Sequence, residues 1–249
     1  MRNRDQTICL RTVDYSETSQ VVTFFTRDGG VVRLIAKGSK RAKSKTGGTL
    51  DMLAEGELVY TTGRGDSLGT VVEFSESSSH AQLRRSGGRL NTALYMLEVV
   101  TLSLAEHDPH PEVFDLLSNS LRRIGEPDAP VPAVLAYFQW RLLRLIGLLG
   151  DLDACACCGR PADSAKLTHF SPRAGGPVCG SCAADYPDKT ILQPDAATGL
   201  ATLVAARAGR RVQLIDQQAQ AVNCLLAYHL SEQLGRRTKM ARHAIGGKS

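Results

Sequence analysis

Two pairs of cysteines constrain the fold of this chain more than any other feature of its 249 residues. Cys155 and Cys158 form one Cys-x-x-Cys pair, Cys179 and Cys182 form the other, and residues 159–178 separate them. Two thiolates at this spacing can bind one metal ion, and two such pairs on neighbouring hairpins complete the tetrahedral shell that zinc prefers. The intervening length suffices for a strand, a turn and a returning strand. We therefore predict a zinc ribbon at about 153–188, with one structural Zn²⁺ in a closed site that leaves no position for catalysis.

Two further side chains offer alternatives for that ligand set. Cys157 lies inside the first pair, but only Cys155 with Cys158 keeps the two-residue spacing followed by Gly159. His169 is a possible substitute ligand, although a surface histidine on the ribbon is the interpretation we favour. The remaining alternative is four free cysteines in a reducing cell. Two pairs at the spacing of a metal site argue against it.

The other cysteines and the overall composition indicate an intracellular protein. Cys9 and Cys224 lie among apolar residues and are expected to be buried as small hydrophobic side chains. A total of seven cysteines with metal-type spacing does not suggest a disulfide framework. The sequence opens with mixed charged and apolar residues, and Arg141 and Arg144 interrupt its most apolar helix. We expect a soluble, cytoplasmic protein without a signal peptide or membrane span.

The positive charge is concentrated in the segment 37–45, KGSKRAKSK, in which five of nine residues are basic and none is acidic. Glycine, serine and alanine fill the gaps, so the segment is expected to be an exposed loop. Such a string of cations suits a phosphate backbone, because each neutralised phosphate releases a counterion. A solvated loop or hinge is the alternative. A position between strands of a predicted nucleic-acid-binding barrel favours a nucleic-acid contact.

That barrel is predicted from period-two segments in the first 80 residues, which are rich in Val, Thr, Tyr and Phe. The expected strands are 7–13, 20–26, 31–36, 57–62 and 69–74. Five short strands with a long loop after the third fit a barrel of the OB type. OB barrels often stack bases on aromatic rings. We expect the aromatic residues here to lie in the core, which favours backbone binding over base contacts; they are Tyr15, Phe24, Phe25, Tyr60 and Phe74.

After residue 80 the apolar residues repeat at helical spacing. Helices are expected around 90–104, 113–124, 134–150, 198–209 and 222–234, with prolines marking the breaks. The predicted fold class is therefore a multidomain α+β protein. An OB-type barrel over 1–79 precedes a helical domain over 80–249, into which the zinc ribbon is inserted.

This arrangement of motifs resembles the DNA repair protein RecO family along essentially the whole chain. The segment that begins the resemblance reads LRTVDYSETSQVVTFFTRDGGVVRLIAKGSKRAKSK. The ribbon adds CxxCG, then FSPRAGG, then the second CxxC, and the closing YHLSEQLGRRTKMARHAI is similar to the family's last helix with its basic end.

The resemblance implies a function without catalysis. RecO-like proteins bind single- and double-stranded DNA, anneal complementary strands, engage the tail of single-strand-binding protein, and work with RecR to help load RecA. It also implies DNA repair and recombination near the nucleoid. In this sequence it puts forward as DNA contacts Lys37, Lys40, Arg41, Lys43 and Lys45.

Two further sets of residues are candidate contacts. The acidic, Phe-ended tail of single-strand-binding protein would suit an apolar groove rimmed by arginine, which Tyr137, Trp140, Arg141 and Arg144 could supply. A packed helix with solvated arginines is the alternative. A second basic patch follows the last long helix and could help to hold a duplex; it comprises Arg236, Arg237 and Lys239, with Arg242 nearby. Cations that satisfy the helix C-terminus explain this patch equally well.

Two other classes of function were weighed against this one. An enzyme acting on nucleic-acid ends is disfavoured, because the glycine that a phosphate-binding loop requires before its lysine is Ala42 here. No metalloprotease, serine-hydrolase or dinucleotide motif is present either. A zinc-ribbon adaptor of transcription or translation is compatible with the composition, and only the family resemblance separates it from a DNA-repair mediator.

Overall fold

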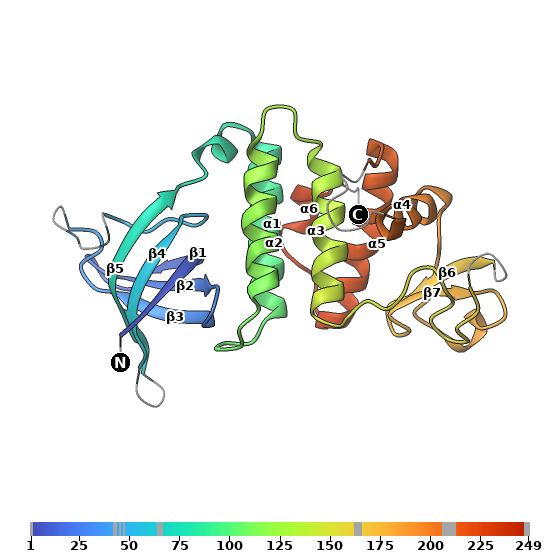
Figure 1. The fold of residues 1–249 in the computed structure, drawn as a ribbon, viewed down its shortest axis with the longest axis horizontal. Coiled ribbons are helices and arrows are strands. Elements are labelled where there is room, and N and C mark those ends of the chain that lie inside the picture. Colours follow the sequence, from blue (N-terminus) through green and yellow to red (C-terminus); the bar gives the residue numbers. More distant parts are fainter. Residues whose placement is uncertain are drawn as a thin grey trace. The chain divides into compact units, whose positions relative to one another are not determined.

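The computed structural model describes residues 2–41, 44, 46, 48–63, 67–161, 166–205 and 213–246. The chain divides into two compact units, Met1–Glu126 and Pro127–Ser249. The first unit therefore holds the predicted barrel together with the first two long helices, and the second holds the remaining helices and the ribbon (Figure 1).

Five strands in the first unit form one sheet that closes into a barrel, in the order β1-β2-β3-β5-β4 (Figure 1). β1 pairs antiparallel with both β2 and β4, and the short parallel pairing of β3 with β5 completes the circuit. The strands are β1 (Arg2–Asp14), β2 (Gln20–Thr26), β3 (Gly30–Ala36), β4 (Glu55–Thr61) and β5 (Gly69–Ser78). All five predicted strands are present, and β1 begins five residues earlier than expected because Arg2 pairs with Thr61.

The barrel core follows directly from the period of two in the strands. β4 alternates between buried and half-buried residues along its whole length, which places Leu58 and Tyr60 inside. Cys9 of β1 is fully buried in this core, as predicted. The rings of Phe24 and Phe74 meet there at a centroid distance of 5.9 Å.

Two helices complete the first unit. A 3₁₀ helix (Ala81–Arg85) leads into α1 (Gly87–Ser103), and α2 (Pro111–Gly125) begins with proline, whose fixed φ suits the first helical turn. α2 packs on the barrel through the rings of Phe25 and Phe114, with centroids 5.6 Å apart. The Arg27 guanidinium makes two hydrogen bonds to the Asp115 carboxylate beside them, at 3.0 and 2.9 Å.

The helical core of the second unit is built on α3 (Val131–Leu145) and α5 (Asp216–Leu234), which lie side by side (Figure 1). Gln139 donates a hydrogen bond of 2.8 Å to Asn223, and both side chains are buried. Buried amides that satisfy each other in this way fix the register of the two helices. α4 (Pro194–Ala205) packs on α5, and a short α6 (Ala241–Ala244) follows.

The third predicted helix ends earlier than the prediction of residue 150. Gly147 adopts φ +74°, and the N–H of Leu148 bonds the carbonyl of Leu143 while that of Gly147 bonds the carbonyl of Arg144. This pair of bonds is a Schellman motif, which terminates a helix at a left-handed glycine. Leu149 therefore lies beyond the helix, although it is buried as its apolar character suggests. The predicted continuation of α4 to residue 209 falls on residues outside the described ones.

The expectation that Cys224 is buried is wrong. Its side chain is exposed on α5, where Gln220 donates a hydrogen bond to the sulfur. The buried stripe of α5 runs through Val222, Leu226 and Leu230, and a residue two positions from Val222 points to the opposite side of the helix. Cys224 is therefore flanked by apolar residues in the sequence but does not share their buried face of the helix.

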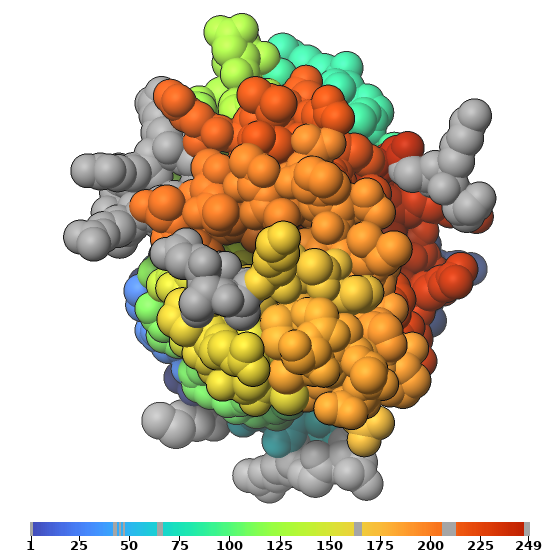
Figure 2. Space-filling model, turned by 90° about the vertical axis from the view of Figure 1, so that its right-hand side faces the viewer, coloured from blue at the N-terminus to red at the C-terminus, as the bar shows by residue number. Residues whose placement is uncertain are grey.

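The ribbon is a three-stranded sheet in the order β7-β6-β8, inserted between α3 and α4. Its strands are β6 (Leu167–Ser171), β7 (Gly176–Cys179) and β8 (Thr190–Ile191). The sheet packs on α5 through the buried Phe170, and Tyr228 donates a hydrogen bond of 3.0 Å to the Asp188 carbonyl. Figure 2 views this end of the second unit, where the ribbon (yellow to light orange) adjoins the segment that carries α4 (orange).

Candidate metal centre and nucleic-acid interface

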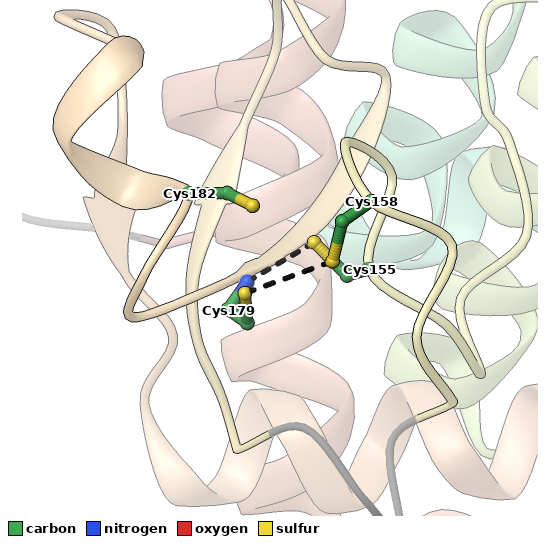
Figure 3. A group of neighbouring side chains, drawn as sticks. All are labelled: Cys155, Cys158, Cys179 and Cys182. Carbon is green, nitrogen blue, oxygen red and sulfur yellow. Dashed lines mark hydrogen bonds between the residues drawn. The ribbon is translucent and has the colours of Figure 1, made fainter.

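The four cysteines of the two pairs converge in the ribbon. The sulfur atoms of Cys155, Cys158, Cys179 and Cys182 all lie within 4.8 Å of one another (Figure 3). The first two come from the loop before β6, Cys179 ends β7, and Cys182 follows in the next turn. Each pair therefore contributes from one side, as the spacing predicts.

Local backbone geometry shapes each pair. The N–H of Gly159 bonds the Cys155 carbonyl at 2.9 Å, and Gly159 adopts φ +70°, a conformation that side chains other than glycine disfavour. The Cys182 N–H bonds the Cys179 carbonyl at 3.1 Å and makes the second turn. The Cys179 N–H also donates to the Cys155 sulfur at 3.3 Å, so one pair supports the other (Figure 3).

The electrostatics favour the thiolate form at two of the four cysteines, Cys155 and Cys179. Burial raises the pKa of the Cys155 thiol, but backbone N–H groups of Cys158, Cys179 and Cys157 donate to its sulfur and bring the pKa down to about 6. The pKa of Cys179 is lowered too, first of all by the backbone N–H of Cys182. Neighbouring sulfurs, Cys157 first, raise the pKa of Cys182. Neighbouring sulfurs whose thiol pKa values depend on one another in this way form a cluster that a bound cation would stabilise in the thiolate form.

The arrangement fits a tetrahedral metal ion. Four sulfurs at about 2.3 Å from a zinc ion would lie about 3.8 Å apart. The Cys158 and Cys179 sulfurs are 4.0 Å apart, and all four sulfurs lie within 4.8 Å of one another. The four side chains can therefore hold one metal ion with little movement.

Two neighbouring candidates lie outside this group. Cys157 is exposed, and its sulfur lies beside Cys182 and Tyr186, where it raises the pKa of the tyrosine. His169 lies on β6 with its Nδ1 2.9 Å from the Thr168 hydroxyl. Neither belongs to the four-sulfur group.

The first part of the basic segment lies on a well-anchored turn after β3. Lys37 and Arg41 are exposed, and the Lys40 ammonium lies 2.8 Å from the Asp14 carboxylate. Lys43 and Lys45 fall outside the described residues.

The buried side-chain amide of Gln20 anchors that turn to the barrel. Gln20 accepts hydrogen bonds from the Ser39 hydroxyl and the Leu50 N–H, both at 3.0 Å, and donates to the Leu50 carbonyl. Gly38 also donates its N–H to the Ser19 hydroxyl. Ser39 and Leu50 are thus both tied to Gln20 at the start of β2, which fixes the described turn that carries Lys40 and Arg41.

The other predicted contact residues lie in the second unit. Arg236, Arg237 and Lys239 are exposed after the end of α5. On α3, the Arg144 guanidinium carbon lies 5.8 Å from the centroid of the Trp140 ring, within cation–π range, and the Tyr137 ring is 5.7 Å from the same ring. Arg141 is half-buried on this helix. Trp140 is buried, and its indole N–H has no hydrogen-bond partner.

Two features escaped the sequence analysis. Tyr15, predicted to be a core residue, is 66% exposed, whereas the other four barrel aromatics are buried. Tyr15 follows β1 in a turn, where the alternation of buried and exposed residues ends. Its position beyond the last predicted strand residue, Val13, is the sequence feature that indicates an exposed side chain. The second feature is a buried network in which Glu55 accepts hydrogen bonds from the His80 ring and the Ser118 hydroxyl, at 2.9 and 2.6 Å. Its members are far apart in sequence, so no local pattern indicates it.

Within the part of the chain that the structure describes, no helix combines the length and the apolar character needed to cross a lipid bilayer.

Comparison with known proteins identifies the family. The model of the Recombination protein O N terminal matches residues 1–79, and that of the Recombination protein O C terminal matches residues 84–242. A DNA repair protein RecO of Anaeromyxobacter dehalogenans is 34% identical over 92% of both chains. The RecO of Rhodopirellula baltica is 35% identical over 70% of this chain and 65% of its own length, just under two thirds of that relative. The RecO of Bacillus pumilus is 31% identical over 78% of this chain. The chain therefore belongs to the RecO family.

Proposed function

We propose that this protein is a DNA-binding mediator of recombinational repair. In this role it anneals complementary single strands and helps to load a recombinase onto DNA coated by single-strand-binding protein. The observation that carries the proposal is that the two RecO family models together span both compact units. The curated relatives named above are each called a DNA repair protein.

The barrel is the proposed DNA-binding domain, over residues 1–79. Its strand order, with a parallel β3–β5 contact closing an otherwise antiparallel sheet, supports the OB type. The anchored cations Lys37, Lys40 and Arg41 support contact with phosphates, and Lys43 and Lys45 would extend it. A surface that grips the backbone of two strands lowers their mutual repulsion and leaves the bases free to pair. Annealing of this kind needs no bond-breaking step, and we assign no catalytic residue.

We assign one Zn²⁺ to Cys155, Cys158, Cys179 and Cys182. A thiolate-rich tetrahedral donor set supports zinc over oxygen-preferring cations, and a closed four-sulfur shell supports a structural role. The ion would cross-link the loop before β6 to the end of β7.

The proposed partners act on residues 80–249, which include the ribbon at about 153–188. An acidic, Phe-ended tail of single-strand-binding protein suits the surface around Tyr137, Trp140, Arg141 and Arg144, because the stacked arginine offers a cation beside aromatic rings. Arg236, Arg237 and Lys239 are proposed as further duplex contacts. A RecR-like protein is the remaining partner, and the site of action is the cytoplasm, at the nucleoid.

Strand annealing tests the proposal. Two complementary oligonucleotides are coated with the cognate single-strand-binding protein, this protein is added without ATP, and duplex formation is followed by energy transfer between dyes. We expect fast, salt-sensitive annealing that fails when the single-strand-binding protein lacks its tail. Absence of acceleration by a folded, metal-loaded protein would reject the mediator function and would favour a zinc-ribbon adaptor that binds RNA or protein.

A further inference from the structure

Tyr15 is the most exposed aromatic side chain of the barrel. It is 66% exposed, whereas Phe24 and Phe25 are fully buried and Tyr60 is 4% exposed. Placing a large aromatic ring in water forgoes the burial that stabilises its neighbours, at about 25 cal/mol per Å² of apolar surface. The position of Tyr15 therefore contributes little to the barrel core and is available for a ligand.

The turn that carries this ring is held by its own hydrogen bonds. The N–H groups of Tyr15 and Ser16 both bond the Ser19 carbonyl, at 3.0 and 3.2 Å, and the Thr18 N–H bonds the Ser16 hydroxyl at 3.4 Å. The backbone is thus ordered before any ligand arrives. A ligand that contacts the ring does not have to order the turn, which lowers the entropic cost of binding.

Cations are fixed beside the same turn. The Lys40 N–H bonds the Thr18 carbonyl at 3.2 Å, and the Gly38 N–H bonds the Ser19 hydroxyl at 3.3 Å. The Lys40 ammonium reaches Asp14, the residue before Tyr15, at 2.8 Å. Two segments about twenty residues apart in sequence therefore present an aromatic face and basic side chains at one place on the barrel.

We propose that Tyr15 is a stacking platform for a base of single-stranded nucleic acid, whose phosphates lie along Lys37, Lys40 and Arg41. This inference rests on the proposed DNA-binding function and adds a base contact to it. An aromatic face next to a basic track is the combination that binds single strands without sequence preference, because every base has a π-face. A duplex hides those faces in its stack, so Tyr15 distinguishes single strands from duplexes. Asp14 holds Lys40 in place until a phosphate replaces its carboxylate.

Binding of fluorescein-labelled oligothymidylate and of a labelled duplex, measured by anisotropy, tests this proposal with Tyr15→Ala and Tyr15→Phe. Alanine should weaken single-strand binding between about 5-fold and 150-fold, the equivalent of about 1–3 kcal/mol for one stacked base. Duplex binding should change less than about twofold, and phenylalanine should preserve both affinities because it keeps the ring. The slope of affinity against salt should stay unchanged, since no phosphate contact is removed. Equal melting temperatures of the three proteins serve as the folding control.

An abasic single strand provides the second readout. It keeps the phosphates and lacks the π-faces, so wild type and Tyr15→Ala should bind it equally. The stacking proposal is overturned if alanine weakens single-strand and duplex binding alike, or if it weakens neither. A loss confined to binding of a protein partner also overturns it and identifies Tyr15 as a protein contact. If the wild-type protein binds no DNA at all, the proposed function itself fails, which is a distinct result.

Discussion

The edge of one ring meets the face of the other where Phe170 packs against His229, with ring centroids 5.3 Å apart and planes at 81°. Phe170 belongs to the ribbon strand β6, and His229 belongs to the core helix α5. The His229 Nε2–H also donates a hydrogen bond of 2.7 Å to the Leu148 carbonyl, just beyond α3. The ribbon is thus joined to the helical core, so a metal ion bound by the ribbon would contribute to the stability of the second unit.

Loss of one thiolate should therefore destabilise the second unit. We expect Cys182→Ser to abolish stoichiometric zinc binding and to lower the melting temperature by more than about 5 °C, because binding of a structural ion contributes directly to folding free energy. Zinc content by mass spectrometry and thermal unfolding by circular dichroism are the measurements.

Cys157→Ser is the matched control for this experiment. It removes a neighbouring exposed sulfur that lies outside the four-sulfur group, and it should retain one zinc per chain. Loss of zinc from this variant would show that Cys157 belongs to the ligand set.

Acid should weaken the second unit through His229. Burial lowers the pKa of this imidazole below 6.5, although the Leu148 carbonyl and the Asp188 carboxylate act in the opposite direction. As the pH falls below 6.5, the unfolded state takes up a proton before the folded state does. The free energy of unfolding should therefore fall progressively until the pH reaches the lowered folded pKa. Urea unfolding followed by fluorescence measures it, since Trp140 is the single tryptophan and lies in this unit.

Comparison with His229→Gln separates this effect from acid release of the metal. Glutamine places an amide N–H near the position of Nε2 and does not titrate, so the variant should show a flatter dependence of stability on pH. Identical pH profiles for the two proteins would mean that His229 does not cause the loss.

The hydrogen bond from Ser118 to Glu55 should stabilise the contact between α2 and the barrel. Burial raises the pKa of Glu55, but the hydrogen bonds from His80 and Ser118 outweigh it and the net pKa is lowered, so the carboxylate is charged at neutral pH. We expect Ser118→Ala to cost about 1.5–3 kcal/mol, the range for hydrogen bonds to charged groups. Urea unfolding at pH 7 followed by circular dichroism measures the change.

Ser120→Ala provides the comparison, since Ser120 is equally buried on the same helix. The difference between the two variants should begin to shrink as the pH falls below 4.5, where the unfolded state takes up a proton first, and should reach its minimum once the pH has passed the lowered pKa of Glu55 in the folded state. A difference that stays constant as the pH falls through this range would contradict this account.

Charge removal from the basic segment should flatten the salt dependence of DNA binding. We expect Lys40→Ala, Arg41→Ala and Lys43→Ala together to weaken binding to all sequences alike. The negative slope of log affinity against log salt should become less steep by about 2 for single strands, since each of the three phosphate contacts contributes about 0.7. Anisotropy titrations at several salt concentrations measure it.

The control variant removes equal charge from the ribbon, where Arg160, Lys166 and Arg173 are exposed. Its slope should match that of the wild type. An unchanged slope in the basic-segment variant, or the same drop in both variants, would reject the assignment of this loop to DNA.

The cysteine pairs, the barrel strands and the end of α3 differ in how far the sequence predicts them. The two Cys-x-x-Cys pairs predict the metal site, because two residues and a glycine fix each turn locally. The strands of the barrel are equally local, since alternation marks the buried face of β4. The end of α3 was missed because a glycine within an apolar stripe acquires its left-handed conformation only when the following leucines pack.

By itself, then, the sequence determined which segments become strands, helices and the turns that carry the paired cysteines, since these depend on residues a few positions apart. Tertiary structure alone decided that Tyr15 remains in solvent and that Cys224 faces away from the core. It also decided that Glu55 meets Ser118 across 63 positions of chain. The physical reason is that burial and long-range hydrogen bonds arise from packing whole elements together, which no local spacing encodes.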